Sequence, residues 1–135
     1  DGLGIKTTIS QIEDVEDWPT FESEARRLKM DTGLAVNLET PIGVVTGLKN
    51  IPSTILLMAV AAGCSGQEFN NNVLPKISYL RKFLGENAEI LVDGGINLKT
   101  AKLCKEYGAS GVVVNTYLWE NFEANLNSLR RIGVE

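Results

Sequence analysis

The sequence predicts an α/β protein in which parallel strands alternate with helices. Two runs, 55–60 and 112–114, contain only apolar residues, which is typical of strands that are covered on both faces. Amphipathic helical patterns lie between the candidate strands, and this alternation continues along the whole chain. Alternating units of this kind imply parallel strands joined by right-handed crossovers.

Five segments are the strand candidates: 5–12, 33–38, 54–60, 89–92 and 111–114. The first helix is expected to pack Phe21, Ala25 and Leu28 on one face. The acidic run 13–17 before it is expected to be a solvated helix start, where carboxylates favour the helix dipole. A second helix is predicted to begin with Thr40 as N-cap and Pro41 at its first position.

The later helices have clearer ends. The third helix is closed by Gly85, and the fourth is capped by Asn97 and stopped by Gly108. The apolar faces of the last three helices consist of Val73, Ile77, Leu80 and Leu84, then Leu98, Ala101 and Cys104, then Phe122, Leu126 and Leu129. We expect Trp18 and Trp119 to pack against helices. The sequence therefore predicts one domain over residues 1–135.

Two architectures fit this pattern. One is an open, flavodoxin-like sheet, and the other is part of a (β/α)8 TIM barrel. A whole barrel needs about 250 residues, and at least about 200, whereas this chain has 135. By length alone the open sheet is favoured. In both architectures the site forms at the carboxyl ends of the strands.

The bulk composition excludes several classes of function. The net charge of −4 argues against a nucleic-acid-binding surface, and the longest apolar stretch, 55–62, is too short to span a bilayer. Cys64 and Cys104 have no zinc-ligand spacing, which fits a reducing, cytoplasmic setting. The chain has no histidine, so it lacks the commonest metal ligand and general base. Because it begins at Asp1, we expect it to be a piece of a longer protein.

Two glycine-containing loops follow neighbouring strands. Gly63 and Gly66 follow the third strand, and Gly94 and Gly95 follow the fourth. Glycines at such positions let backbone N–H groups approach an anion, and the next helix start adds a positive dipole. Each loop alone is equally consistent with a plain tight turn. The two loops together favour a phosphate site.

Asp93 is the only carboxylate that ends a strongly apolar strand. Partial desolvation there is expected to raise its pKa and to suit the carboxylate to proton transfer. The structural alternative is an aspartate that forms an Asx turn before the two glycines. Residue pattern alone leaves both interpretations open.

Three segments, "TGLAVNLETPI", "LLMAVAAGCSGQEF" and "ILVDGGINLKTAKLCKEYGAS", together resemble the C-terminal part of the ribulose-phosphate 3-epimerase family. The family's sixth strand reads like Met-x-Val-x-Pro-Gly-Phe-x-Gly-Gln-x-Phe, and its seventh like Val-Asp-Gly-Gly-Ile. The matching residues here are Met58, Val60, Gly63, Gly66, Gln67, Phe69 and Val92 to Ile96. The resemblance implies that the five strands are about the fourth to eighth of a TIM barrel.

The resemblance also implies a reaction, the interconversion of ribulose 5-phosphate and xylulose 5-phosphate by proton transfer at C3. Asp93 would be one acid/base group and a ligand of a divalent metal (Zn, Fe, Mn or Co). The second aspartate and two histidine ligands would lie upstream of this chain. The residues around substrate and phosphate would be Met58, Gly63, Gly66, Gln67, Gly94, Gly95, Asn115 and Thr116. Alone, the fragment is expected to be inactive.

The chain departs from the family pattern at three places. Ala62 replaces a proline, Cys64-Ser65 replaces Phe-Gly, and Asn115-Thr116 replaces the Gly-Ser that helps to hold phosphate. These departures leave two alternatives open, a non-catalytic phosphate-binding or scaffold domain and another phosphosugar lyase or decarboxylase. A part-barrel would expose strand edges. We therefore expect truncation, closure by a second chain or homo-oligomer, or a rearranged open sheet.

Overall fold

A computed structural model describes residues 4–61, 63 and 66–133 of the protein. Its five strands are β1 (Thr7–Gln11), β2 (Asp31–Val36), β3 (Thr54–Met58), β4 (Glu89–Asp93) and β5 (Gly111–Val113). Its helices are α1 (Trp18–Arg27), α2 (Gly43–Thr46), α3 (Val73–Leu84), α4 (Leu98–Glu106), α5 (Thr116–Glu120) and α6 (Phe122–Ile132). None of the helices in the described ranges has the length and apolar character that a membrane crossing requires.

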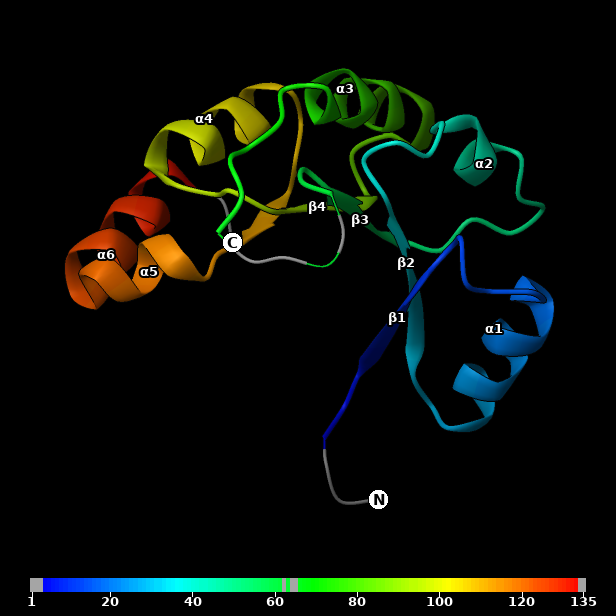
Figure 1. Ribbon diagram of the computed structural model, residues 1–135. Helices are drawn as coiled ribbons and strands as arrows, with labels where there is room; N and C mark the ends of the chain where they lie inside the picture. Colours follow the sequence, from blue (N-terminus) through cyan, green and yellow to red (C-terminus); the bar gives the residue numbers. More distant parts are fainter. Residues whose placement is uncertain (1–3, 62, 64–65, 134–135) are drawn as a thin grey trace.

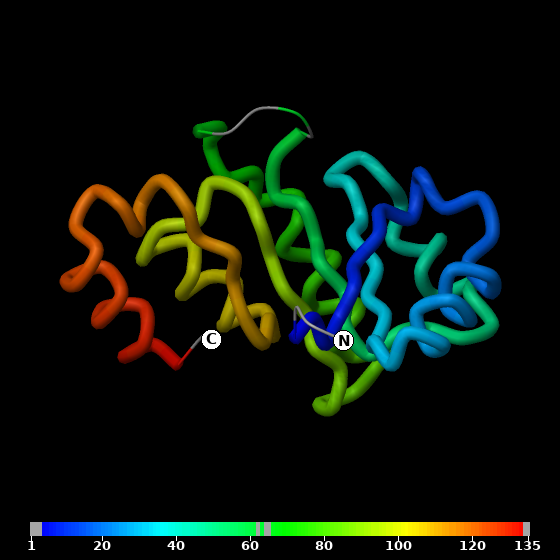
Figure 2. Tube along the Cα trace, turned by 90° about the horizontal axis from the view of Figure 1, so that it is seen from below, coloured from blue at the N-terminus to red at the C-terminus, as the bar shows by residue number. Residues whose placement is uncertain are grey.

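The strands pair in parallel in the order β1-β2-β3-β4-β5. This sequential order is the winding of a barrel, because a flavodoxin-like sheet has the order 2-1-3-4-5. The alternative of a flavodoxin-like sheet is therefore wrong. The sheet is an open arc whose edges are β1 and β5, and the helices arch over one side of it (Figures 1 and 2). The fold is a partial (β/α)8 barrel.

The core lies between the outer face of the arc and the helices. Side chains at alternate strand positions point outward, and these positions on the three central strands are almost completely buried: Leu34, Val36, Ile55, Leu57, Ile90 and Val92. Helix α3 contributes Val73, Ile77 and Leu80, and helix α4 contributes Ala101 and Cys104. The opposite, concave face is less covered, and Ile9 and Val113 there are 39% and 42% exposed. The concave face is therefore free to form a site.

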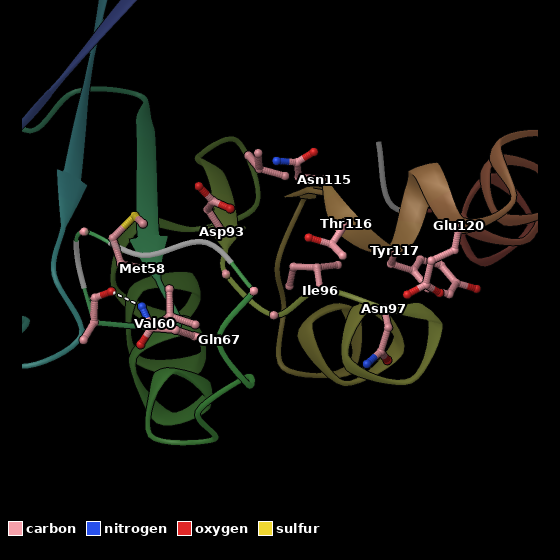
Figure 3. Close-up of a pocket in the computed structure, with 16 residues that line it drawn as sticks. Met58, Val60, Gln67, Asp93, Ile96, Asn97, Asn115, Thr116, Tyr117 and Glu120 are labelled. Carbon is pink, nitrogen blue, oxygen red and sulfur yellow. Dashed lines mark hydrogen bonds between the residues drawn. The ribbon is translucent and has the colours of Figure 1, made fainter.

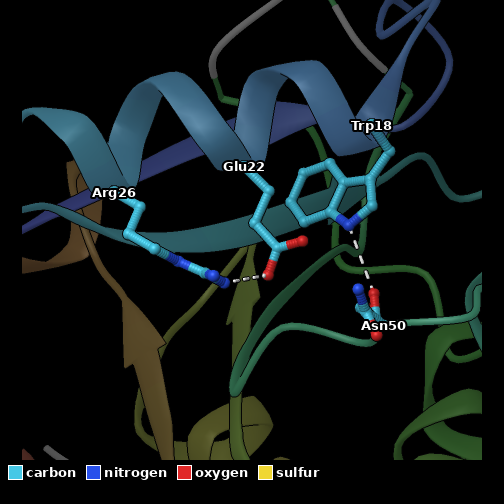
Figure 4. A network of polar contacts seen from close by, with 4 residues as sticks. All are labelled: Trp18, Glu22, Arg26 and Asn50. Atoms are coloured by element: carbon cyan, nitrogen blue, oxygen red, sulfur yellow. Dashed lines mark hydrogen bonds and ion pairs between the residues drawn. The ribbon is translucent and has the colours of Figure 1, made fainter.

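Helix α1 has the predicted start and a different end. Asp17 is its N-cap, and the Asp17 carboxylate accepts from Thr20 N at 3.3 Å. Trp18 is buried and donates from Nε1 to the Asn50 carbonyl at 3.2 Å, while Glu22 and Arg26 form an exposed ion pair (Figure 4). The predicted packing of Leu28 is wrong. The helix ends at Arg27, since the chain turns back into β2, and Leu28 is 56% exposed.

One further prediction about the helices is wrong. The second helix does not begin at Thr40–Pro41; α2 begins at Gly43 and has no side-chain cap. The carbonyl groups before it bind Lys76, which keeps the segment in a turn. Trp119 does contact a helix, as predicted: it stacks on Phe122 of α6 with ring centroids 5.4 Å apart, although its side chain is 70% exposed. The predicted cap of α4 is also confirmed, since Asn97 forms a capping box with Thr100.

Arg81 ties together the amino-terminal face of the sheet. Its Nε donates to the Gly108 carbonyl at 2.8 Å, and its Nη1 donates to the carbonyls of Gly85 and Ala88 at 2.7 and 2.9 Å. Its Nη2 donates to the hydroxyl of Ser110 at 2.8 Å. One guanidinium therefore joins the end of α3, the start of β4 and the turn before β5.

We expect Arg81→Ala to lower the free energy of unfolding by about 2–4 kcal/mol, because hydrogen bonds to a charged donor are worth about 1.5–3 kcal/mol each. Arg81→Lys is expected to recover less than half of the loss, since an ammonium cannot reproduce the planar fork. Chemical denaturation measures both variants. Lys82→Ala, at the exposed next position, is the control, and an equal loss in that variant would contradict this role.

Candidate active site at the carboxyl ends of the strands

A pocket of about 610 Å³ lies at the carboxyl ends of β3, β4 and β5 (Figure 3). Its lining residues are Met58, Val60, Ala61, Gly63, Gly66, Gln67, Asp93, Gly94, Gly95, Ile96, Asn97, Val113, Asn115, Thr116, Tyr117 and Glu120. Every candidate site residue of the sequence analysis is in this set. Parallel strands bring these loops together because their carboxyl ends meet at one edge of the sheet. The pocket thus brings together the residues that the sequence analysis proposed for a site.

Asp93 is the last residue of β4 and points into the pocket (Figure 3). In the sheet register it is paired with Met58 on one side and Val113 on the other. Desolvation in this setting raises the pKa of the Asp93 carboxyl, while a hydrogen bond from the Gly94 N–H opposes the shift. The carboxylate is thus more basic than an ordinary aspartate, as the sequence predicts.

Gly94 and Gly95 have a packing role that the sequence does not show. Their φ angles are +115° and +62°, a region that side chains disfavour. A Cβ on Gly94 would lie 2.6 Å from a methyl carbon of Val60, and one on Gly95 would lie 2.3 Å from the backbone nitrogen of Phe69. The two loops therefore touch backbone to backbone. These glycines are needed for loop packing whether or not an anion binds.

In the loop after β3, Gly63 and Gly66 line the pocket. Gly63 and Gly66 also have positive φ angles, +109° and +80°, but a Cβ on either would meet nothing within 4 Å. The side chain of Gln67 donates from Nε2 to the Ala61 carbonyl at 2.7 Å. This bond closes the base of the loop. The sequence departures at Ala62, Cys64 and Ser65 lie outside the described residues.

The wall after β5 contains a short helix that the sequence analysis missed. Asn115 precedes α5 without capping it by its side chain, and Thr116 is the first residue of the helix. Both line the pocket, as do Tyr117 and Glu120 from the same helix. A five-residue helix is too short to show a periodic apolar pattern. The residues that replace the family's Gly-Ser are therefore placed on the pocket wall, with two further side chains beyond them.

The described residues do not form a metal site by themselves. Asp93 is one candidate ligand, and no group of three or more His, Cys, Asp or Glu side chains in the described ranges is placed to hold an ion. A stable divalent site usually needs at least about three protein ligands, and the chain has no histidine. Asp93 alone does not fit the implied metal centre.

Lys76 of α3 fixes the turn after β2. Its Nζ donates to the carbonyls of Asn37 at 3.2 Å and Thr40 at 2.7 Å, and also to that of Leu38. Burial lowers the pKa of Lys76, and the carboxylates of Glu39 and Glu13 oppose this shift. The mouth of the barrel is therefore held on this side by one partly buried ammonium.

Glu13 supports the same turn from the loop after β1. Its Oε1 accepts from the Asn37 N–H at 2.9 Å, and the side chain of Gln11 donates to Asn37 Oδ1 at 2.8 Å. Partial burial works against ionisation of Glu13, but hydrogen bonds from Thr40 and Asn37 outweigh it and hold the Glu13 pKa below its usual range. The loops after β1 and β2 are thereby coupled to each other and, through Lys76, to helix α3.

We expect Lys76→Met to lower the free energy of unfolding by about 2–4 kcal/mol, since several buried carbonyls lose a charged donor. Glu13→Gln is expected to cost less at neutral pH, and its cost should disappear on acidification. A group whose folded-state pKa lies below its unfolded-state pKa adds stability at pH values above the unfolded-state pKa. This contribution to the free energy of unfolding is lost as pH falls through the folded-state pKa. Urea denaturation across pH measures both, with exposed Lys102→Met as the control.

Parallel strands in sequential order, with a pocket at their carboxyl ends, define the class of protein as a (β/α)8-barrel protein with an enzyme-type site. The ribulose-phosphate 3 epimerase family model matches residues 5–119. The chain belongs to the ribulose-phosphate 3-epimerase family.

Several curated relatives agree with this assignment. Ribulose-phosphate 3-epimerase of Chlamydia pneumoniae is 33% identical over 122 residues, which are 87% of this chain and 53% of the relative. The Bacillus subtilis enzyme of that name is 35% identical over 91 residues, covering 64% of this chain and 42% of the relative. The chloroplastic ribulose-5-phosphate-3-epimerase of Arabidopsis thaliana is 31% identical over 97 residues, covering 70% and 34%. The chain spans about half the length of the first of these relatives.

Proposed function

We propose that this protein epimerises a ketopentose phosphate at C3, with Asp93 as one of two acid/base groups. The names of the relatives state this reaction for those proteins. The observation that carries the proposal is the place of Asp93, a partly desolvated carboxylate at the end of β4 that points into the pocket. A general base needs reach to the proton and a pKa shifted toward working pH; Asp93 points into the pocket, and burial raises its pKa.

The chemistry requires one proton to leave and one to arrive. The Asp93 carboxylate accepts the proton from C3, and the C–H electron pair moves into the C2–C3 bond while the C2 carbonyl oxygen takes up the negative charge. A second acid then protonates C3 from the opposite face, which gives the epimer. The described residues supply the Asp93 wall, and the concave side facing it is open. We assign the second group to the part of the barrel that would face β4.

Phosphate binding is proposed for the wall between Gly95 and Thr116. Gly63 and Gly66 line the pocket with room beside their Cα atoms, and the Thr116 hydroxyl can donate to an anion from the start of α5. We also propose that the open edges of β1 and β5 pair with further barrel strands, from the same chain or another one, since unpaired edges are an aggregation hazard.

Proton NMR of the full-length protein with ribulose 5-phosphate in D₂O tests the proposed reaction. We expect loss of the C3 proton signal together with formation of xylulose 5-phosphate. Phosphate binding with no exchange at C3 would contradict the epimerase and support a non-catalytic phosphate-binding domain. That second candidate is favoured by Asn115 and Thr116, whose side chains occupy the position where the family pattern has Gly-Ser.

A further inference from the structure

The pocket wall carries negative charge only. Of the sixteen lining residues, Asp93 and Glu120 are the only ones with a charged side chain, and none is lysine or arginine. Both ion pairs formed by the described residues lie on α1 and involve neither of these carboxylates. An oxyanion that enters the pocket therefore meets carboxylates without a compensating cation from this wall.

Glu120 is placed close to the proposed phosphate position by the helical repeat. It is the last residue of α5, four positions after Thr116. Residues four apart share one helix face, with Cβ atoms about 5–6 Å apart. Both line the pocket, so this face of α5 is turned toward the pocket. Glu120 therefore lies on the same pocket wall as the Thr116 hydroxyl.

We propose that Glu120 is a specificity-determining residue that makes the pocket discriminate between ligands by the charge of their oxyanion. The proposal rests on the proposed function, because it assumes that this wall receives the phosphate. Coulomb repulsion is proportional to the ligand charge, so a doubly charged group is penalised twice as strongly as a singly charged group of the same shape. The pocket therefore takes phosphorylated ligands more weakly than its shape alone would allow.

Two isosteric probes separate charge from shape in the full-length protein at about pH 8. Methyl phosphate is doubly charged there, since a phosphate ester loses its second proton near pH 6, whereas methyl sulfate is singly charged. We expect Glu120→Gln to lower the dissociation constant of methyl sulfate about 2–3-fold. The dissociation constant of methyl phosphate should fall by about the square of that factor, roughly 4–10-fold. Calorimetric titration measures both dissociation constants.

Glu123→Gln is the matched control, because Glu123 lies in the first turn of α6, is exposed and does not line the pocket. It is expected to change neither constant. The proposal would be overturned if Glu120→Gln lowered both dissociation constants by the same factor or changed neither of them. It would also be overturned if neither the wild type nor the variant bound the probes. Binding by Glu120→Gln alone would support it. The gain should also shrink in about 1 M salt, where the screening length is about 3 Å.

The test of the reaction and the test of this inference fail separately. If C3 exchange is seen and the two probes respond alike to Glu120→Gln, the reaction stands and the charge discrimination is refuted. If exchange is absent and the probes respond with the squared ratio, the epimerase is refuted and Glu120 keeps its role at a phosphate-binding pocket.

Discussion

Replacing Asp93 with asparagine is expected to reduce C3 proton exchange by about 10²–10⁴-fold, the usual contribution of a positioned general base. An amide keeps the size of the side chain and cannot accept the proton. Exchange of the C3 proton in D₂O measures the effect in the full-length protein. Glu68→Gln is the matched control, because Glu68 is an exposed carboxylate on the neighbouring loop that does not line the pocket. Unchanged exchange in Asp93→Asn would refute the assigned role.

The same substitution is expected to make the fold more stable at neutral pH. Desolvation raises the folded-state pKa of Asp93, so the wild-type protein is favoured when this group is protonated and loses that stability as pH rises through the raised pKa. An asparagine does not ionise and avoids the loss. Denaturation at about pH 7 should therefore favour Asp93→Asn, and the difference should vanish at about pH 3. A variant that is less stable than wild type at pH 7 would contradict this account.

Gly95→Ala is expected to lower the free energy of unfolding by about 2–4 kcal/mol, the sum of left-handed backbone strain and overpacking. The added Cβ would lie 2.3 Å from the Phe69 nitrogen and 2.7 Å from the Phe69 Cα. Neither is the movable end of a side chain, so the loops have to separate. Thermal and chemical denaturation measure the loss.

Gly4→Ala is the matched control for backbone strain, because Gly4 has nearly the same φ, +64°, and a Cβ there would meet nothing within 4 Å. An equal loss in both variants would show that loop contact contributes nothing. The comparison also bears on phosphate binding. A fall in phosphate affinity in Gly95→Ala shows that Gly95 helps to bind the anion only if the fall is larger than the loss of stability explains.

Much of the fold follows from local pattern. Apolar runs and the helix ends at Gly85 and Asn97 are encoded within a few residues, and both ends are found where the sequence predicts them. Predictions failed where a distant residue decides the local structure. Thr40 does not begin a helix because Lys76, 36 residues away, binds the carbonyls of that segment. Spacing along the chain does not report such a contact.

The sequence by itself determined the alternation of strands and helices, the family, and the place of Asp93 at a strand end. It did so because periodicity and motif are local properties. Only the tertiary structure decided the strand order, the backbone contact that requires Gly95, and the presence of Glu120 on the pocket wall. Each of these depends on segments far apart in the chain that meet in space. The two glycines after Asp93 therefore join two loops as well as opening a pocket.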